Sequence, residues 1–142
     1  RWNQGRAWEL SLLHQKLHLT NEPAHVQHFE VSHGYNLVTV NRAWKKEEFI
    51  YRVGAGIVLA HPKTTIRGKT LFDEGGLFGT GYYLAGPTLE TGLEKQFPLT
   101  DRLAFTTEGK VTASYGKIPV ADGKAEVPHA AFHGLLGFDY KF

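Results

Sequence analysis

The last ten residues of the chain, 133–142, read HGLLGFDYKF. Apolar or aromatic side chains occupy every second position back from the carboxyl terminus: Leu136, Phe138, Tyr140 and Phe142. Because successive side chains of a β-strand point to opposite faces of its sheet, this alternation predicts a strand with one apolar face. Such a face needs a cover, which is either a protein core or a lipid bilayer.

The same alternation runs through several segments that are longer than ordinary strands. It is clearest in 49–61 and 102–115, whereas a change of phase near Gly34 predicts a β-bulge at that glycine. The first segment also allows a helix. We predict an all-β chain with these six strands: about 6–19, 28–44, 49–61, 81–97, 102–117 and 129–142.

The composition limits the class of protein. A length of 142 residues predicts a single domain, 1–142. No apolar run approaches the roughly 20 residues that a membrane-spanning helix needs. The formal charge of +2 comes from mixed signs, so no basic block favours nucleic acid. Cysteine and methionine are both absent, which excludes disulfides and indicates a mature or trimmed product.

The connections between the predicted strands alternate in length. The links 45–48 and 98–101 are short and polar, whereas three are longer: 20–27, 61–81 and 117–128. Turns at one end of a sheet and loops at the other are typical of an up-and-down antiparallel barrel, above all of a transmembrane one.

Two kinds of barrel fit an alternating sequence. A soluble ligand-binding barrel turns its apolar faces inward, whereas a membrane barrel turns them outward and keeps charges inside. The predicted polar faces carry balanced charges next to small residues, which suits a narrow interior, and aromatic residues gather near strand ends. We favour the membrane barrel and predict an interior ion-pair network of Arg52, Glu90, Glu94, Arg102, Glu108, Lys110, Asp139 and Lys141.

The terminal strand resembles the C-terminal assembly signal of bacterial outer-membrane β-barrel proteins, with its alternate hydrophobics and final aromatic. The resemblance implies an outer-membrane location, contact with membrane lipid or lipopolysaccharide, and recognition by the barrel assembly machinery. It identifies an architecture and not one function. The function that we favour is a structural or binding role through the long loops, with an envelope protein as one kind of partner. The residues that match the signal are Leu136, Phe138, Tyr140 and Phe142.

The strand count departs from this family. Its small single-chain barrels have at least eight strands. Six predicted strands therefore imply that two precede Arg1, that the pattern misses some, or that chains share one barrel.

A second, looser resemblance lies in residues 30–36, EVSHGYN. His33 and Asn36 match part of the His-x-Ser-Asn motif of lipid A deacylase (PagL-type) outer-membrane barrels, which are serine hydrolases. Tyr35 stands where that motif has its nucleophilic serine. The alternative function that this implies is an outer-leaflet lipid acyl hydrolase.

On that alternative, His33 is the general base and Ser32 the nucleophile. Neighbours on a regular strand face opposite ways, so a bulge at Gly34 must bring the two side chains together. Without that bulge, His33 is predicted to face outward in alternation with Phe29, Val31 and Leu37.

All eight histidines are predicted to lie at the loop end of the barrel or in its upper half. A metal site at the rim could combine His14 and His18 with His33 or His61. However, His14 and His18 are about 13 Å apart along a strand, too far to chelate one ion together. We therefore predict no metal site and no cofactor.

Overall fold

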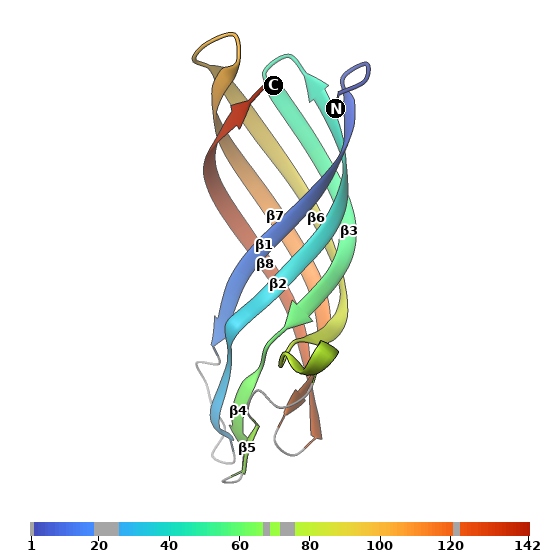
Figure 1. Cartoon of the computed structure of the whole chain (residues 1–142), viewed down its shortest axis with the longest axis vertical. Coiled ribbons are helices and arrows are strands. Elements are labelled where there is room, and N and C mark those ends of the chain that lie inside the picture. The colour runs from blue at the N-terminus through green and yellow to red at the C-terminus, as the bar shows by residue number, and fades with distance from the viewer. Residues whose placement is uncertain (1, 19–25, 67–68, 72–75, 121–122) are drawn as a thin grey trace.

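A computed structural model describes the backbone of residues 2–18, 26–66, 69–71, 76–120 and 123–142. It describes side chains there except at 18, 26–33, 63–66 and 69–71. The chain is all-β, as predicted. Its long strands, shown in Figure 1, are β1 (Arg6–His18), β2 (Val26–Lys46), β3 (Phe49–Ala60), β6 (Tyr83–Pro98), β7 (Leu103–Val120) and β8 (Gly123–Tyr140).

These six strands form one antiparallel, up-and-down sheet in the order β1-β2-β3-β6-β7-β8, curled into a half-barrel. Among the described residues, β1 pairs only with β2 and β8 only with β7. Both chain termini lie at one end of the sheet (Figure 1), which also carries residues 47–48 and 99–102 and is here named the turn end.

The opposite end of the sheet, here named the loop end, carries three short elements. Strand β4 (Lys63–Ile66) pairs with the start of β2, and β5 (Lys69–Leu71) pairs with β4. A 3-10 turn, η1 (Leu77–Gly79), precedes β6. The predicted loop 61–81 is therefore partly ordered. The described part of the chain contains no helix that is long and apolar enough to cross a bilayer.

The structure decides two points of secondary structure that the sequence left open or assigned wrongly. Residues 6–18 are a strand and not a helix, because Trp8, Leu10 and Leu12 alternate outward along it. The prediction of a long loop at 117–128 is wrong, because β7 and β8 pair as far as Val120 and Gly123. The polar residues that suggested a loop are the solvated ends of two strands.

The predicted bulge in β2 is present. Gln15 and Leu17 of β1 pair with Tyr35 and Val31, so three residues of β2 lie opposite one residue of β1. Gly34, within this bulge, has a φ of 128°, a backbone conformation that favours glycine. Beyond the bulge Leu37 faces inward and is buried, not outward as predicted from alternation with His33.

A second irregularity lies in β6. The register with β3 shifts between Val58 and Leu59, and Gly86 has a φ of 157°. The shift turns Leu84 outward and Ala85 inward. Strict alternation with the exposed Leu89 and Leu93 would place Ala85 on the outer face, so the bulge changes the phase of the strand. From the shift to the turn end, exposed Leu89 and Leu93 alternate with buried Glu90 and Glu94.

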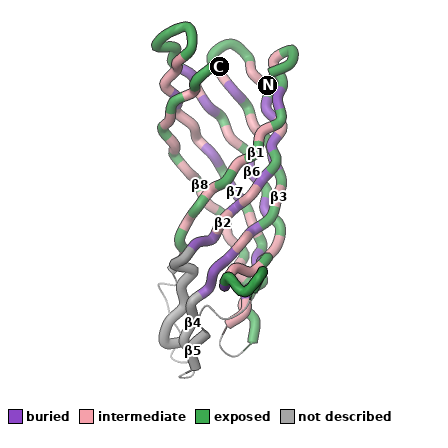
Figure 2. Tube along the Cα trace, in the orientation of Figure 1, coloured by how far each residue is buried: buried purple, intermediate pink, exposed green. Residues whose placement is uncertain are grey.

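Where side chains are described, the burial pattern separates an inner from an outer face along the six long strands (Figure 2). Inside lie two apolar clusters. One gathers buried residues from four strands near the loop end: Tyr35, Leu37, Val58, Ala60, Ala85 and Ile118. Leu13 and Leu17 of β1 and Ala125 and Val127 of β8 pack against it. The other consists of Ala7, Ala43 and Ile50. Between them the inner face is polar.

Candidate functional site: the charged interior

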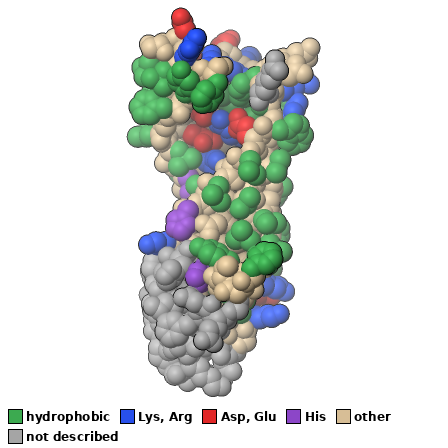
Figure 3. Space-filling model, viewed as in Figure 1, with side chains coloured by type: hydrophobic (Ala, Val, Ile, Leu, Met, Phe, Trp, Pro, Cys, Tyr) green, Lys and Arg blue, Asp and Glu red, His purple; other side chains and the backbone are tan. Residues whose placement is uncertain are grey.

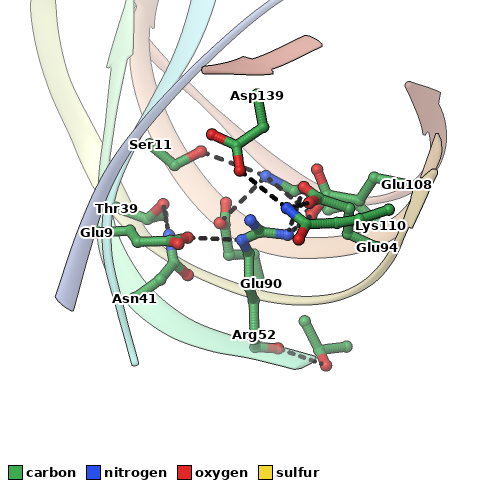
Figure 4. A network of polar contacts seen from close by, with 12 residues as sticks. Glu9, Ser11, Thr39, Asn41, Arg52, Glu90, Glu94, Glu108, Lys110 and Asp139 are labelled. Atoms are coloured by element: carbon green, nitrogen blue, oxygen red, sulfur yellow. Dashed lines mark hydrogen bonds and ion pairs between the residues drawn. The ribbon is translucent and has the colours of Figure 1, made fainter. Parts of the chain in front are cut away.

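Arg52 of β3 is the centre of the polar interior (Figure 4). Its Nε atom donates to Glu9 Oε2 at 2.6 Å, which links β3 to β1. Its Nη1 atom lies 3.0 Å from Glu94 Oε2 on β6 and 3.3 Å from Glu108 Oε1 on β7. One guanidinium therefore connects four strands, which suits its planar array of donors.

Lys110 of β7 forms the second cationic centre. Its Nζ atom lies 3.3 Å from Glu90 Oε1 and 3.9 Å from Glu108 Oε1, so Glu108 lies between the two cations. The same ammonium donates to Ser11 Oγ on β1 at 3.3 Å. We name as the charge network the residues Glu9, Arg52, Glu90, Glu94, Glu108 and Lys110.

Gln96 of β6 joins two more charged groups to this network. Its Nε2 atom donates to Glu94 Oε1 at 3.1 Å and to Asp139 Oδ2 at 2.9 Å. Lys45 Nζ donates to Gln96 Oε1 at 2.5 Å. The interior ion pairs therefore continue toward the turn end as a chain of hydrogen bonds.

Small residues make room for these side chains. A Cβ atom at Gly92 would lie 2.6 Å from Glu108 Oε1. At Gly54 a Cβ atom would collide with Asn41 Oδ1, and at Gly56 with the backbone of β2. The packing of the inner face therefore requires glycine at positions 54 and 56, whereas Gly92 leaves space for the end of the Glu108 side chain.

The structure brings together most of the residues predicted for the interior. Arg52, Glu90, Glu94, Glu108 and Lys110 contact one another, and Asp139 joins through Gln96. Arg102 and Lys141 do not join them. Both are exposed at the turn end, where Lys141 N donates to the carbonyl oxygen of Arg102 at 2.9 Å.

Sequence reasoning missed four participants: Glu9, Ser11, Lys45 and Gln96. Glu9 and Ser11 alternate with outward apolar residues of β1, so a strand assignment of 6–18 with its faces would have identified them. Lys45 lies in the segment 45–48, which was predicted as a link, so its inward direction was not considered. Gln96 lies in the predicted strand 81–97 but is uncharged, so a search for interior charges passed over it.

The histidines with described side chains are hydrogen-bonded or packed within the sheet. His14 Nδ1 is 2.8 Å from Asn36 Oδ1, and His133 Nε2 is 2.9 Å from Thr112 Oγ1. Gln15 Nε2 lies 3.4 Å from His129 Nδ1, and His61 packs its ring 4.9 Å from that of Tyr82. Across the described part of the chain, no three His, Cys, Asp or Glu residues form a group that could hold a metal.

The side chains of the hydrolase candidates Ser32 and His33 lie outside the described residues, although their backbone belongs to β2. Tyr35, at the serine position of the resembled motif, is fully buried inside. Its hydroxyl lies 3.0 Å from Ser114 Oγ. The tyrosine is therefore an interior packing residue.

The outer face of the sheet is apolar (Figure 3). Large exposed side chains occur on all six long strands, among them Trp8, Leu10, Leu12, Val40, Val53, Ile57, Leu89, Leu93, Val111, Phe132 and Leu136. The predicted assembly residues Leu136, Phe138, Tyr140 and Phe142 are exposed as well. Near the turn end the rings of Phe97, Phe105 and Phe138 form a row, with centroid distances of 6.1 and 5.7 Å.

Comparison with known proteins yields no match among protein-family models, curated proteins or solved structures.

Proposed function

We propose that the chain crosses the bacterial outer membrane as a β-barrel that has a structural or binding role. The observation that carries this proposal is the polarity of the sheet, which is apolar on its outer face and charged on its inner face. Leu10 is 77% exposed on the outer face of β1, whereas Glu90 is 4% exposed on the inner face of β6. Burying charges while exposing large apolar side chains is favourable only when the outer surface meets hydrocarbon.

The dimensions of the strands agree with this proposal. A transmembrane β-strand needs about 9–11 residues, and the long strands here have 12 to 21. The aromatic row near the turn end matches the interfacial girdle of such barrels. A soluble ligand-binding barrel would need the opposite polarity, with its apolar face around the ligand.

The proposed barrel has about eight strands. Strands β1 and β8 run in opposite directions, so an even number of strands between them keeps every pairing antiparallel. Ser11 and Gln15 of β1 already reach Lys110 and His129 on the far side of the interior. That narrow span favours two additional strands over a wide barrel shared between chains.

On this proposal the loop end faces outward from the cell, and the partners are membrane lipid or lipopolysaccharide and an envelope protein. The assembly machinery of the outer membrane would read the strand that ends at Phe142. Segments 20–27 and 61–81 would offer the binding surface.

The test is to fold the purified chain in detergent and to compare its migration on SDS gels with and without boiling. We expect a shift between the two, because a folded barrel resists SDS until heated. We also expect brominated lipid to quench Trp8 fluorescence when Trp2 and Trp44 are replaced by Phe. A folded protein that stays monodisperse without detergent would contradict the proposal in favour of the soluble barrel.

One observation favours the second candidate, a lipid acyl hydrolase. The bulge in β2 lies at residues 32–34, where the hydrolase needs it to bring Ser32 beside His33. Removing a general base typically lowers a rate by about 10²–10⁴-fold. The measurement is release of fatty acid from lipid A in detergent, compared between the unmodified protein and His33→Ala. We expect no release from either, and release that depends on His33 would establish the hydrolase.

A further inference from the structure

Two buried oxygen atoms of the interior have no hydrogen-bond partner within the described part of the chain: Glu90 Oε2 and Asn41 Oδ1. Glu90 is 4% exposed and Asn41 is 0% exposed. The other polar atom of each side chain is engaged, since Glu90 Oε1 binds Lys110 and Asn41 Nδ2 donates to Thr39 Oγ1 at 3.2 Å. Leaving a buried acceptor unpaired costs free energy, so these atoms require a donor or a cation.

The two oxygens belong to one row across the sheet. Asn41 of β2 pairs with Gly54 of β3, and Gly54 pairs with Glu90 of β6. Two strand spacings separate Asn41 and Glu90 by about 10 Å between Cα atoms. Gly54 has no side chain, and the Asn41 amide occupies the space beside its Cα atom. The inward side chains of Asn41 and Glu90 therefore flank the same part of the interior (Figure 4).

The charges of the interior favour a cation over a neutral donor. Five carboxylates face this region or join it through hydrogen bonds: Glu9, Glu90, Glu94, Glu108 and Asp139. Three basic groups accompany them: Lys45, Arg52 and Lys110. The described interior thus has a formal excess of two negative charges. A confined region with such an excess attracts cations.

We propose that Glu90 Oε2 and Asn41 Oδ1 bind a monovalent metal cation, Na⁺ or K⁺. Carboxylate and amide oxygens are hard ligands that suit such ions. A divalent site usually recruits several carboxylates to one ion, whereas the other carboxylates here are engaged by Arg52, Lys110 and Gln96. The site lies inside the sheet, so it does not depend on what covers the outer face.

The test is the midpoint of thermal unfolding of the folded protein, measured in chloride salts at constant ionic strength. Choline, a bulky organic cation that does not bind as a bare metal ion does, is replaced stepwise by Na⁺ or K⁺. We expect the midpoint to rise and then saturate with one of the two ions. Glu90→Gln should abolish the saturable rise. Asn41→Ala should raise the half-saturating concentration about tenfold, the effect of losing one hydrogen-bonding oxygen.

The matched control is Glu126→Gln, which changes an exposed carboxylate on β8 and should leave the ion response unchanged. An equal midpoint in choline, Na⁺ and K⁺ would overturn the proposal, because water or another side chain then satisfies the two oxygens. An unaltered ion response in Glu90→Gln would overturn it too. If that variant does not fold, an unchanged half-saturating concentration in Asn41→Ala overturns the proposal in its place.

Discussion

Arg52 is the residue whose loss should most weaken the interior. Its side chain is 12% exposed and lies between three glutamates on three other strands. Arg52→Ala leaves these carboxylates buried beside one another without their shared cation. Breaking a buried ion pair in this way typically destabilises a protein by about 3–5 kcal/mol.

Denaturant unfolding in micelles measures that loss. Arg52→Lys should reduce the free energy of unfolding by less, because lysine keeps the positive charge and lacks only the planar array of donors. Arg102→Ala is the control, since Arg102 is exposed at the turn end and should change stability by no more than about 0.5 kcal/mol. Equal effects of Arg52→Ala and Arg102→Ala would refute the central role of Arg52.

Phe78 is the second residue for which we make a prediction, namely that its side chain contacts lipid. It is 100% exposed on η1 and has a φ of 55°, a conformation that bulky side chains rarely adopt. The turn is tied to the start of β6, because Leu77 N donates to Tyr82 O at 2.6 Å. A strained, exposed aromatic at a fixed position suggests contact with the lipid interface.

The absence of cysteine makes this expectation easy to measure. Phe78→Cys, labelled with a polarity-sensitive fluorophore in lipid vesicles, should report an apolar environment. Glu47→Cys at the exposed turn end should report water. If the fluorophore at position 78 reports water while brominated lipid quenches Trp8 fluorescence, Phe78 does not contact lipid. The proposal that the barrel crosses the membrane would still stand.

At the scale of a strand, a substitution in β6 can show whether water or lipid covers the outer face. Leu89 is 61% exposed on that face. In water, Leu89→Lys should change stability by less than about 0.5 kcal/mol. In a bilayer, a lysine near the midplane of a barrel costs about 2–4 kcal/mol.

The measurement is the free energy of unfolding of Leu89→Lys in lipid vesicles, relative to the unmodified protein. Leu99→Lys, at an exposed turn between β6 and β7, is the comparison and should be nearly neutral. If Leu89→Lys is as harmless as Leu99→Lys, the outer face of β6 does not meet hydrocarbon.

The strands also show how far sequence patterns reach. The long alternating runs of β3 and β7 identify both faces, because β3 is in unbroken register with β2, and β7 with both β6 and β8. Alternation failed at Ala85 and Leu37, where a glycine bulge shifts the phase. A bulge depends on pairing with a partner strand, so one strand's sequence does not reveal its exact position.

The sequence also predicted part of the charged interior, namely which charged side chains point inward, but not all of their contacts. Inward charges on regular strands, such as Arg52 and Lys110, follow from alternation alone. The contact of Glu9 with Arg52 does not, because it depends on how strongly the sheet curls. Arg102 and Lys141 have the right charge, but the turn end places them outside the interior.

For the whole molecule, the charge network predicts electrical behaviour. A barrel of about eight strands is just wide enough for side chains to fill it. Lys110 of β7 reaches Ser11 of β1 across the interior, and Arg52 links β3 to β1 and β7. Planar-bilayer recordings should therefore show no large, steady conductance. A stable open current would mean that the charge network does not fill the lumen.

The up-and-down order of the strands has a consequence for the rate of folding. Each described pairing of long strands joins neighbours in sequence, so the sheet can grow one hairpin at a time with little loop-closure entropy. The side-chain contacts across the interior are different. Ser11–Lys110 and Gln15–His129 join residues that are 99 and 114 positions apart. We expect these contacts to form last, so that Ser11→Ala and Gln15→Ala accelerate unfolding and leave the folding rate nearly unchanged.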